Sequence, residues 1–247
     1  MRNLPPTRRS LPFGAAMPAR RVCLLLCLLA AGALTACGGA SSSTSSTAGT
    51  TAKAASQTTT TATSSTASTA NQRPGPEGMP LEAGPNLAPA SSTTQGSTVD
   101  GIQCAPVEQL AYHIHSHLQV YIDGQPRALP AAIGMVDPVA QQTPYGPFYG
   151  AQQCIYWLHT HATDGVIHVE SPTARIYTLG NFFDEWGQPL SGTQVAGAKG
   201  KVTAFVNGKP WTKDPRTIAL VPHAAIQLDE GSPAVAPQPV TWAGANL

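Results

Sequence analysis

Charged residues are scarce in this chain. They make up 11% of its 247 residues, and the formal net charge at pH 7 is only +1. A protein that binds nucleic acid usually carries a basic patch or stripe, and neither that nor an acidic tail is present. We therefore expect no nucleic-acid partner. The composition favours an exported domain that does not use net charge to bind a partner.

The chain also lacks an apolar run long enough for a comfortable membrane span. The longest run covers residues 22–36, whereas a spanning helix needs about 20 residues. Arginines precede this run, and Leu34-Thr35-Ala36-Cys37 ends it. This order resembles the signal peptide and lipobox of bacterial lipoproteins. The resemblance implies that residues 1–36 are a lipoprotein signal peptide and that Cys37 becomes the lipidated (palmitate-type) N-terminus.

The resemblance also bears on location. In such lipoproteins an Asp after the acylated Cys favours retention in the inner membrane, and here Gly38 stands at that position. We expect a lipid anchor in the cell envelope, on the periplasmic side of the outer membrane if the cell is Gram-negative. Two alternatives stay open: an ordinary signal peptide cleaved at an Ala-x-Ala-like site, and a start at Met17 instead of Met1.

Cysteine is rare after the leader. Of the five cysteines, two lie in the apolar run and one is Cys37, which leaves Cys104 and Cys154. In an oxidising compartment an isolated pair is expected to form a disulfide. The alternative is a pair of thiols that take part in a metal site.

Low-complexity sequence separates the leader from the folded part. Residues 37–100 are rich in Ser, Thr, Ala and Pro, and we expect a disordered tether there, because such a composition cannot bury enough apolar surface to offset the entropy of ordering. Residues 101–230 predict one folded domain with a core of its own. Residues 231–247 predict an extended Pro-rich tail.

The folded part reads as α+β, mostly antiparallel sheet built from hairpins with one short helix. Turn dipeptides recur at Asp123-Gly124, Asp164-Gly165 and Asn207-Gly208, each between apolar-rich runs. Thr178 predicts the N-cap of a helix that Gly187 ends. Residues 130–150 predict a long ordered loop or lid. A β-grasp-like or small barrel-like closure fits this order of elements.

Six of the seven histidines lie between positions 113 and 168. In 112–122 polar and apolar residues alternate, which predicts a half-buried strand with His113, His115 and His117 on its exposed face. The stretch 154–170 predicts a hairpin whose turn is Asp164-Gly165. The candidate metal ligands are His159, His161, His168, Glu170, His113, His115 and His117.

The pairing in this hairpin depends on its loop. A two-residue turn would place His161 opposite His168 and His159 opposite Glu170. A four-residue loop, 162–165, would change the pairing but keep all four side chains on one face. A three-residue loop with a bulge would move His168 and Glu170 to the other face. The sequence leaves these alternatives open.

Imidazole and carboxylate are the donors on offer, which argues against a Cu(I) carrier and favours Zn(II), with Cu(II) second; Ni(II) and Fe(II) also fit. The strand histidines could join the hairpin in one larger or dinuclear site or form a separate, weaker one. The His159-Thr160-His161 hairpin, the Ile167-His168-Val169-Glu170 strand and the Thr178-Leu-Gly-x-Phe-Phe segment together resemble uncharacterised exported His-rich bacterial proteins of unknown function.

The leading hypothesis is an envelope lipoprotein that binds a divalent transition metal for capture, buffering or delivery, with an envelope metal-handling partner of unknown identity. We expect a binding protein more than an enzyme, because the chain has no nucleophile motif and we assign no catalytic residue. One alternative is a zinc-dependent hydrolase or hydratase that uses a three-His site with Glu170 as the base. Another is a structural or interaction module without a functional metal.

Overall fold

The computed structural model describes residues 73–91 and 94–247. The predicted signal peptide, the lipidation site Cys37 and the first part of the predicted tether lie outside the described residues. Within the described ranges, no helix has both the length and the apolar composition needed to cross a membrane.

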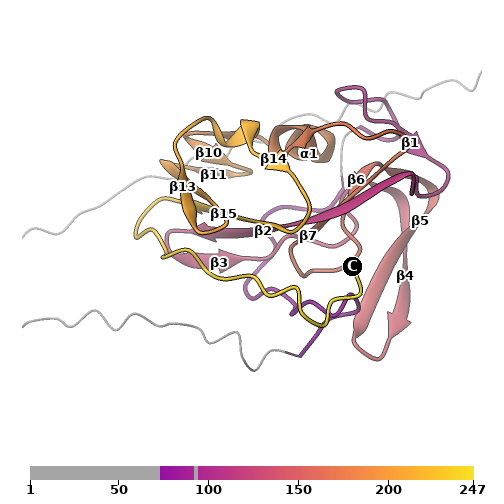
Figure 1. Ribbon diagram of the computed structural model, residues 1–247, viewed down its shortest axis with the longest axis horizontal. Helices are drawn as coiled ribbons and strands as arrows, with labels where there is room; N and C mark the ends of the chain where they lie inside the picture. Colours follow the sequence, from indigo (N-terminus) through magenta and orange to yellow (C-terminus); the bar gives the residue numbers. More distant parts are fainter. Residues whose placement is uncertain (1–72, 92–93) are drawn as a thin grey trace, which may run out of the picture. The chain divides into compact units, whose positions relative to one another are not determined.

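A mixed sheet of seven strands forms the centre of the domain (Figure 1). Along the sheet the strands are β13 (Lys209–Trp211), β12 (Val202–Val206), β15 (Ala224–Glu230), β2 (Tyr112–Ile122), β7 (Val166–Ser171) and β6 (Leu158–His159), and β3 (Gln125–Arg127) pairs with β2. Every pairing is antiparallel except that of β15 with β2. The predicted α+β class, dominated by hairpins, is confirmed.

Smaller elements flank this sheet. One small sheet consists of β1 (Cys104–Ala105), β4 (Met135–Thr143) and β5 (Gly146–Tyr156). A second consists of β9 (Leu190–Ser191), β10 (Gln194–Val195) and β11 (Ala198–Lys199), and β8 (Tyr177–Thr178) pairs with β14 (Ala219–Leu220) in a third. The helix α1 (Leu179–Trp186) and a short 3-10 helix, Pro215–Thr217, complete the domain. The predicted disulfide between Cys104 and Cys154 is confirmed, and it ties β1 to β5.

Helix α1 covers one face of the central sheet. It begins and ends where predicted: the hydroxyl of Thr178 accepts the backbone N–H of Asn181, and Gly187 takes the left-handed conformation with φ 75°. Apolar residues of α1 and of the facing strands form one fully buried core: Leu118, Leu158, Ile167, Val169, Leu179, Phe182, Phe183 and Trp186. Period-2 alternation in the strands and the four apolar positions of α1 together build this core.

The expectation of a loop or lid at 130–150 is wrong, because most of this range forms the long hairpin of β4 and β5. The hairpin projects beyond the central sheet (Figure 1), and most of β4 is exposed. The strand β4 was not predicted because Pro138 lies within it. Among the described strands β4 pairs only with β5, and Pro138 follows a bulge at Asp137. Edge strands and bulges are the places where a sheet tolerates proline.

The predicted tether is also wrong for residues 73–91 and 94–100, which belong to the folded unit. Met79 is fully buried, and the backbone N–H of Leu87 donates to Ala128 O at 2.8 Å. The C-terminal tail is extended as predicted, yet it packs on the domain: Trp242 stacks on His223, and the N–H of Asn246 donates to Glu77 O at 3.0 Å. These two end segments lie together on the sheet face that α1 leaves uncovered (Figure 1).

Candidate metal centre

Three neighbouring strands bring the histidines together. In the middle strand, β7, His168 lies directly opposite His115 of β2 on one side and His159 of β6 on the other. One step along, His113 lies opposite Glu170. Because residues at i and i+2 on a strand point to the same face, all of these side chains project from the sheet face opposite to α1.

The hairpin has the register of the four-residue loop, not that of the two-residue turn. His159 pairs with His168, and ladder pairing between β6 and β7 ends there. The connection needs Gly165, whose φ is +79° and at which an added Cβ would lie 2.7 Å from Nε2 of His117. The even loop length keeps His159, His161, His168 and Glu170 on one face, which is the condition on which the site depends.

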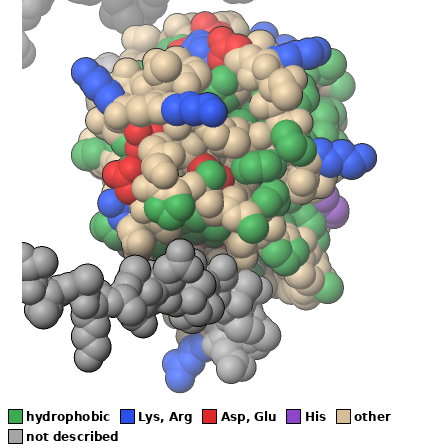
Figure 2. Space-filling view, turned by 90° about the vertical axis from the view of Figure 1, so that its left-hand side faces the viewer, with side chains coloured by type: hydrophobic (Ala, Val, Ile, Leu, Met, Phe, Trp, Pro, Cys, Tyr) green, Lys and Arg blue, Asp and Glu red, His purple; other side chains and the backbone are tan. Residues whose placement is uncertain are grey.

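Most of the histidine face of the sheet is buried, against the expectation that it is exposed; His113 is the exception, with a side chain that is 39% exposed. The exposed fractions are 0% for His159, 3% for His161, 4% for His168, 3% for Glu170 and 6% for His115. Figure 2 shows a different side of the domain, the one on the left in Figure 1, where histidine reaches the surface only at one edge. The end segments 73–91 and 231–247 contribute to the cover through Glu77 and Trp242, although the first was predicted to be a disordered tether and the second an extended tail.

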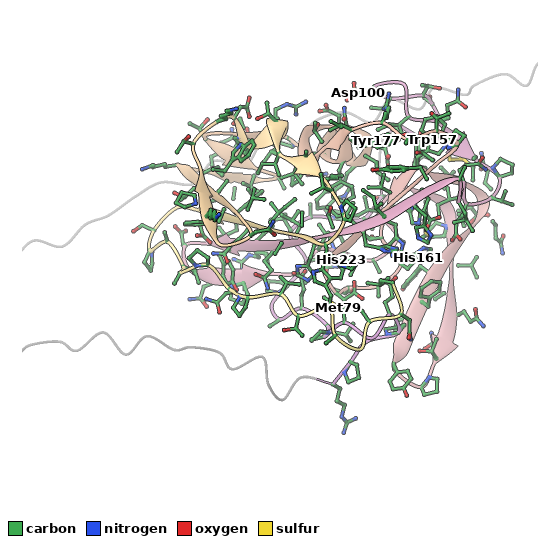
Figure 3. All side chains as sticks on the ribbon, viewed as in Figure 1. Met79, Asp100, Trp157, His161, Tyr177 and His223 are labelled. Atoms are coloured by element: carbon green, nitrogen blue, oxygen red, sulfur yellow. A yellow bond between two sulfur atoms is a disulfide. The ribbon has the colours of Figure 1, made fainter. Side chains whose placement is uncertain are left out.

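The segment that carries His161 is held from several sides. Thr160, between the two hairpin histidines, is buried; its hydroxyl donates to Pro130 O at 2.8 Å and accepts the N–H of Ile133 at 3.1 Å. Phe148 of β5 stacks on the His161 ring with centroids 4.3 Å apart. Figure 3 shows His161 beside the β4–β5 hairpin. The imidazole is therefore fixed by its surroundings before any ligand binds.

Backbone carbonyls set the tautomers of the two hairpin histidines. Nδ1 of His159 lies 2.8 Å from Tyr156 O, and Nδ1 of His161 lies 2.6 Å from Tyr149 O. A carbonyl oxygen only accepts, so Nδ1 carries the proton in each ring and Nε2 keeps its lone pair. Burial lowers the pKa of His161 to about 4 and that of His159 well below its ordinary value. Both imidazoles are therefore neutral at pH 7.

The two Nε2 atoms of His159 and His161 lie only 3.0 Å apart. With both Nδ1 protons given to carbonyls, two lone pairs face each other at this distance, an arrangement that a cation between them would stabilise. Two nitrogens bound to one tetrahedral zinc ion are separated by about 3.3 Å, given Zn–N bonds of about 2.0–2.1 Å. The observed separation is close to that value.

His168 lies between two carboxylates. Its Nε2 is 2.6 Å from Oε1 of Glu77, and its Nδ1 is 3.3 Å from Oε1 of Glu170. Burial alone would lower the pKa of His168, but the hydrogen bonds with Glu170 and Glu77 raise it to about 9. Glu77 can hold the Nε2 proton while Nδ1 faces the cluster, which is the usual way in which a carboxylate orients a metal-binding histidine.

Glu170 has one oxygen that is unused within the described part of the chain. Its Oε1 lies 3.1 Å from Nε2 of His113, 3.3 Å from Nδ1 of His168 and 3.8 Å from Nε2 of His159. Its Oε2 is buried and has no hydrogen-bond partner among the described residues. A buried carboxylate oxygen without a partner is costly, and coordination to a cation would satisfy it.

Two groups of side chains have all their ligand atoms within 4.8 Å of one another: His159, His161, His168 and Glu170, and His113, His115, His168 and Glu170. The structure thus brings together six of the seven predicted ligands. His117 lies on β2 with His113 and His115 but belongs to neither group. Its ring lies edge-to-face with that of Trp242, with the centroids 6.3 Å apart. His223, which the sequence sets apart, stacks on the same indole.

Two carboxylates of the site were not predicted. Glu77 lies in the range assigned to the tether, and Glu108, 3.5 Å from Nε2 of His161 and 42% exposed, lies in the connection between β1 and β2. Glu77 is the first acidic residue of the chain, and this feature of the sequence could have indicated that it has a role in the site. Nothing in the local pattern around Glu108 distinguishes it from an ordinary surface glutamate.

Comparison with known proteins gives no match to a family model, a curated protein or a solved structure. The class is therefore defined by fold and site alone: an α+β domain with a buried cluster of histidines and carboxylates that could hold a divalent metal ion.

Proposed function

We propose that the chain is a metal-binding lipoprotein of the bacterial envelope that captures, buffers or delivers a divalent transition metal. One observation carries the proposal. His159, His161 and His168 each direct one ring nitrogen to an outer oxygen and the other toward a common point beside Glu170. Hydrogen-bonded outer nitrogens and converging inner nitrogens are the arrangement by which proteins orient imidazoles for a metal.

Zinc is the first choice of ion and Cu(II) the second. Three imidazoles and one carboxylate satisfy the four-coordinate preference of Zn(II). Cu(II) accepts the same donors and follows from its position in the Irving–Williams order. The two cysteines of the folded part form a disulfide, so a thiolate site for Cu(I) has no support from them.

The burial of the cluster favours holding an ion over turning over a substrate. A hydrolytic zinc site needs a coordination position that water and substrate can reach. Here His159, His161, His168 and Glu170 are all nearly inaccessible to solvent. Glu170 contacts three imidazoles, which suits a ligand better than a general base.

The place of action follows from the N-terminal sequence. The lipobox-like Leu34-Thr35-Ala36-Cys37 supports anchorage of the mature chain through a lipid on Cys37, with the outer membrane as the proposed location because Gly38 follows. Glu77, which contacts the cluster, lies 40 positions after Cys37. Mass spectrometry of the mature N-terminus tests the lipid anchor separately from the metal.

Calorimetric titration of the complete mature chain, freed of metal by chelator, tests metal binding. We expect Zn(II) to bind tightly to the wild type and at least about 100-fold more weakly to His159→Ala/His161→Ala, because two of four ligands are lost. The matched control is His223→Asn, which removes an imidazole outside the cluster and should bind as the wild type does. Binding no tighter than millimolar in the wild type, or equal binding in the double variant, would overturn the proposal.

A further inference from the structure

We propose that the cluster binds two metal ions, the second held by His113 and His115 and joined to the first through Glu170. This inference rests on the proposed function and adds a second ion to it. The observation that prompts it is the arrangement around β7, which contributes His168 and Glu170: on one side β2 contributes His113 and His115, and on the other β6 contributes His159 and the connection after it contributes His161. The pair on β7 thus lies between two similar sets of donors.

The geometry of the outer pair repeats that of the inner pair. Nε2 of His113 lies 2.9 Å from Nε2 of His115, as Nε2 of His159 lies 3.0 Å from Nε2 of His161. Side chains at i and i+2 of a strand are usually about 6.5–7 Å apart at Cβ, so these rings turn toward each other to bring their nitrogens so close. Each pair can provide two ligands for an ion of its own.

A single metal ion cannot easily bind both histidine pairs. Each of the two ligand groups contains four donors, which fills a tetrahedral shell, and the two groups have only His168 and Glu170 in common. Because Nε2 of His168 contacts Glu77, its Nδ1 can bind only one ion, so a second ion at His113 and His115 would share Glu170 alone with the first. A single ion would leave one histidine pair without a metal. Two ions use all of the donors.

Glu170 is placed to bridge the two ions. Its Oε1 lies between the pairs, 3.1 Å from Nε2 of His113 and 3.8 Å from Nε2 of His159, while its buried Oε2 has no partner among the described residues. Carboxylates bridge the ions of two-metal sites, which lie about 3.5–4 Å apart. The neighbouring carboxylates of Glu77 and Glu108 add negative charge that offsets much of the charge of two dications.

The two ions should differ in affinity. Carbonyl oxygens hold the outer nitrogens of His159 and His161, but His113 and His115 have no such carbonyl partner within the described part of the chain, and His113 is 39% exposed. Outer hydrogen bonds of this kind change metal affinity by about 10–100-fold. The His113/His115 ion is therefore the weaker one and the one that exchanges with the surroundings.

Stoichiometry tests the inference. The complete mature chain is titrated with Zn(II) under a competing chelator, and bound metal is measured by elemental analysis. We expect two ions per chain, with the second bound about 10–100-fold more weakly. His113→Ala/His115→Ala should bind one ion with the tight affinity unchanged, and His223→Asn should bind two. Circular dichroism and denaturation midpoints verify that each variant is folded, and the single variant His113→Ala serves if the double variant is not.

Loading with Cu(II) tests the bridge. Two Cu(II) ions that share a carboxylate couple magnetically, so the electron paramagnetic resonance intensity should fall below that of two isolated ions, and Glu170→Gln should restore it or release the second ion. One ion in the wild type, or two in His113→Ala/His115→Ala, or two uncoupled ions, overturns the inference and leaves the proposed function intact. No bound ion at all overturns both.

Discussion

The two faces of the central sheet are built from the same strands by different means. On the α1 face, Leu118, Ile167 and Val169 pack against fully buried aromatic and aliphatic side chains. On the other face, His115, His168 and His159 are also buried, but polar contacts and two end segments surround them. The first face provides stability through apolar burial, whereas the second buries polar groups whose cost a metal ion can offset.

The largest expected effect concerns the apolar face. Phe182→Ala removes a side chain that is fully buried in the core between α1 and the sheet. Such truncations cost about 3–5 kcal/mol, because burial is lost and a cavity remains. Urea denaturation should show this loss, and Ile176→Ala, at a position that is 75% exposed, should change the free energy of unfolding by less than about 0.5 kcal/mol. Equal losses in both variants would contradict the assigned core.

Metal should stabilise the domain through the opposite face. Because an ion that binds only the folded state adds RT ln(1 + [M]/Kd), Zn(II) at 100 times its Kd should raise the free energy of unfolding by about 2.7 kcal/mol. Differential scanning calorimetry with and without a chelator measures the shift. Phe182→Ala should show the same increment as the wild type, since the site lies on the other face. A zinc increment that persists in His159→Ala/His161→Ala would place the ion elsewhere.

The sequence predicts the apolar face better than the histidine face, and the reason is physical. Alternation in β2 separates the residues of the two faces, and the caps Thr178 and Gly187 set the ends of α1. Both signals are local. The two end segments are anchored by Met79, which is buried, and by Trp242, which contacts His117 and His223; both are isolated apolar residues in stretches whose composition is that of linkers. Composition averaged over such a stretch does not show that a single side chain anchors it.

The same limit applies to the site. Six ligand candidates could be identified because histidines at i and i+2 share a face, and the hairpin register needed only the correct parity of its loop. Glu77 could not be assigned, since its contact with His168 joins positions 91 residues apart through a segment without helix or strand. His117 was included because it follows the alternation, but β2 runs past the cluster before His117 is reached.

Glu77 offers a sharper test of the histidine face. In Glu77→Gln the amide oxygen can still accept a proton from Nε2 of His168, whereas the negative charge is lost. Because a carboxylate behind a ligating imidazole strengthens the metal bond, we expect zinc affinity to fall by about 10–100-fold with little change in stoichiometry. Chelator competition measures it. The matched variant Glu108→Gln, at the exposed rim, should have a smaller effect; the reverse order would show that Glu77 has no role in orienting His168.

The smallest expected effect concerns Glu82, which lies in the segment that covers the histidine face, and it is measured in the absence of metal. Burial raises the pKa of Glu82 from 4.5 to about 8, even though its Oε2 accepts the N–H of Leu129 at 2.6 Å. Between these pH values the folded chain keeps a proton that the unfolded chain has released, so stability is greatest below pH 4.5 and falls as the pH rises through about 8. Glu82 is only partly buried, so water screens part of the effect, and we expect a loss of about 1–2 kcal/mol across this range.

Glu82→Gln keeps an acceptor for Leu129 and cannot titrate. The free energy of unfolding of both proteins is measured in chelator from pH 5 to 9. As the pH rises, the wild type should lose stability relative to the variant. A difference that stays constant with pH would show that Glu82 is ionised in the folded chain and that residues 73–91 cover the histidine face less tightly than its contacts indicate.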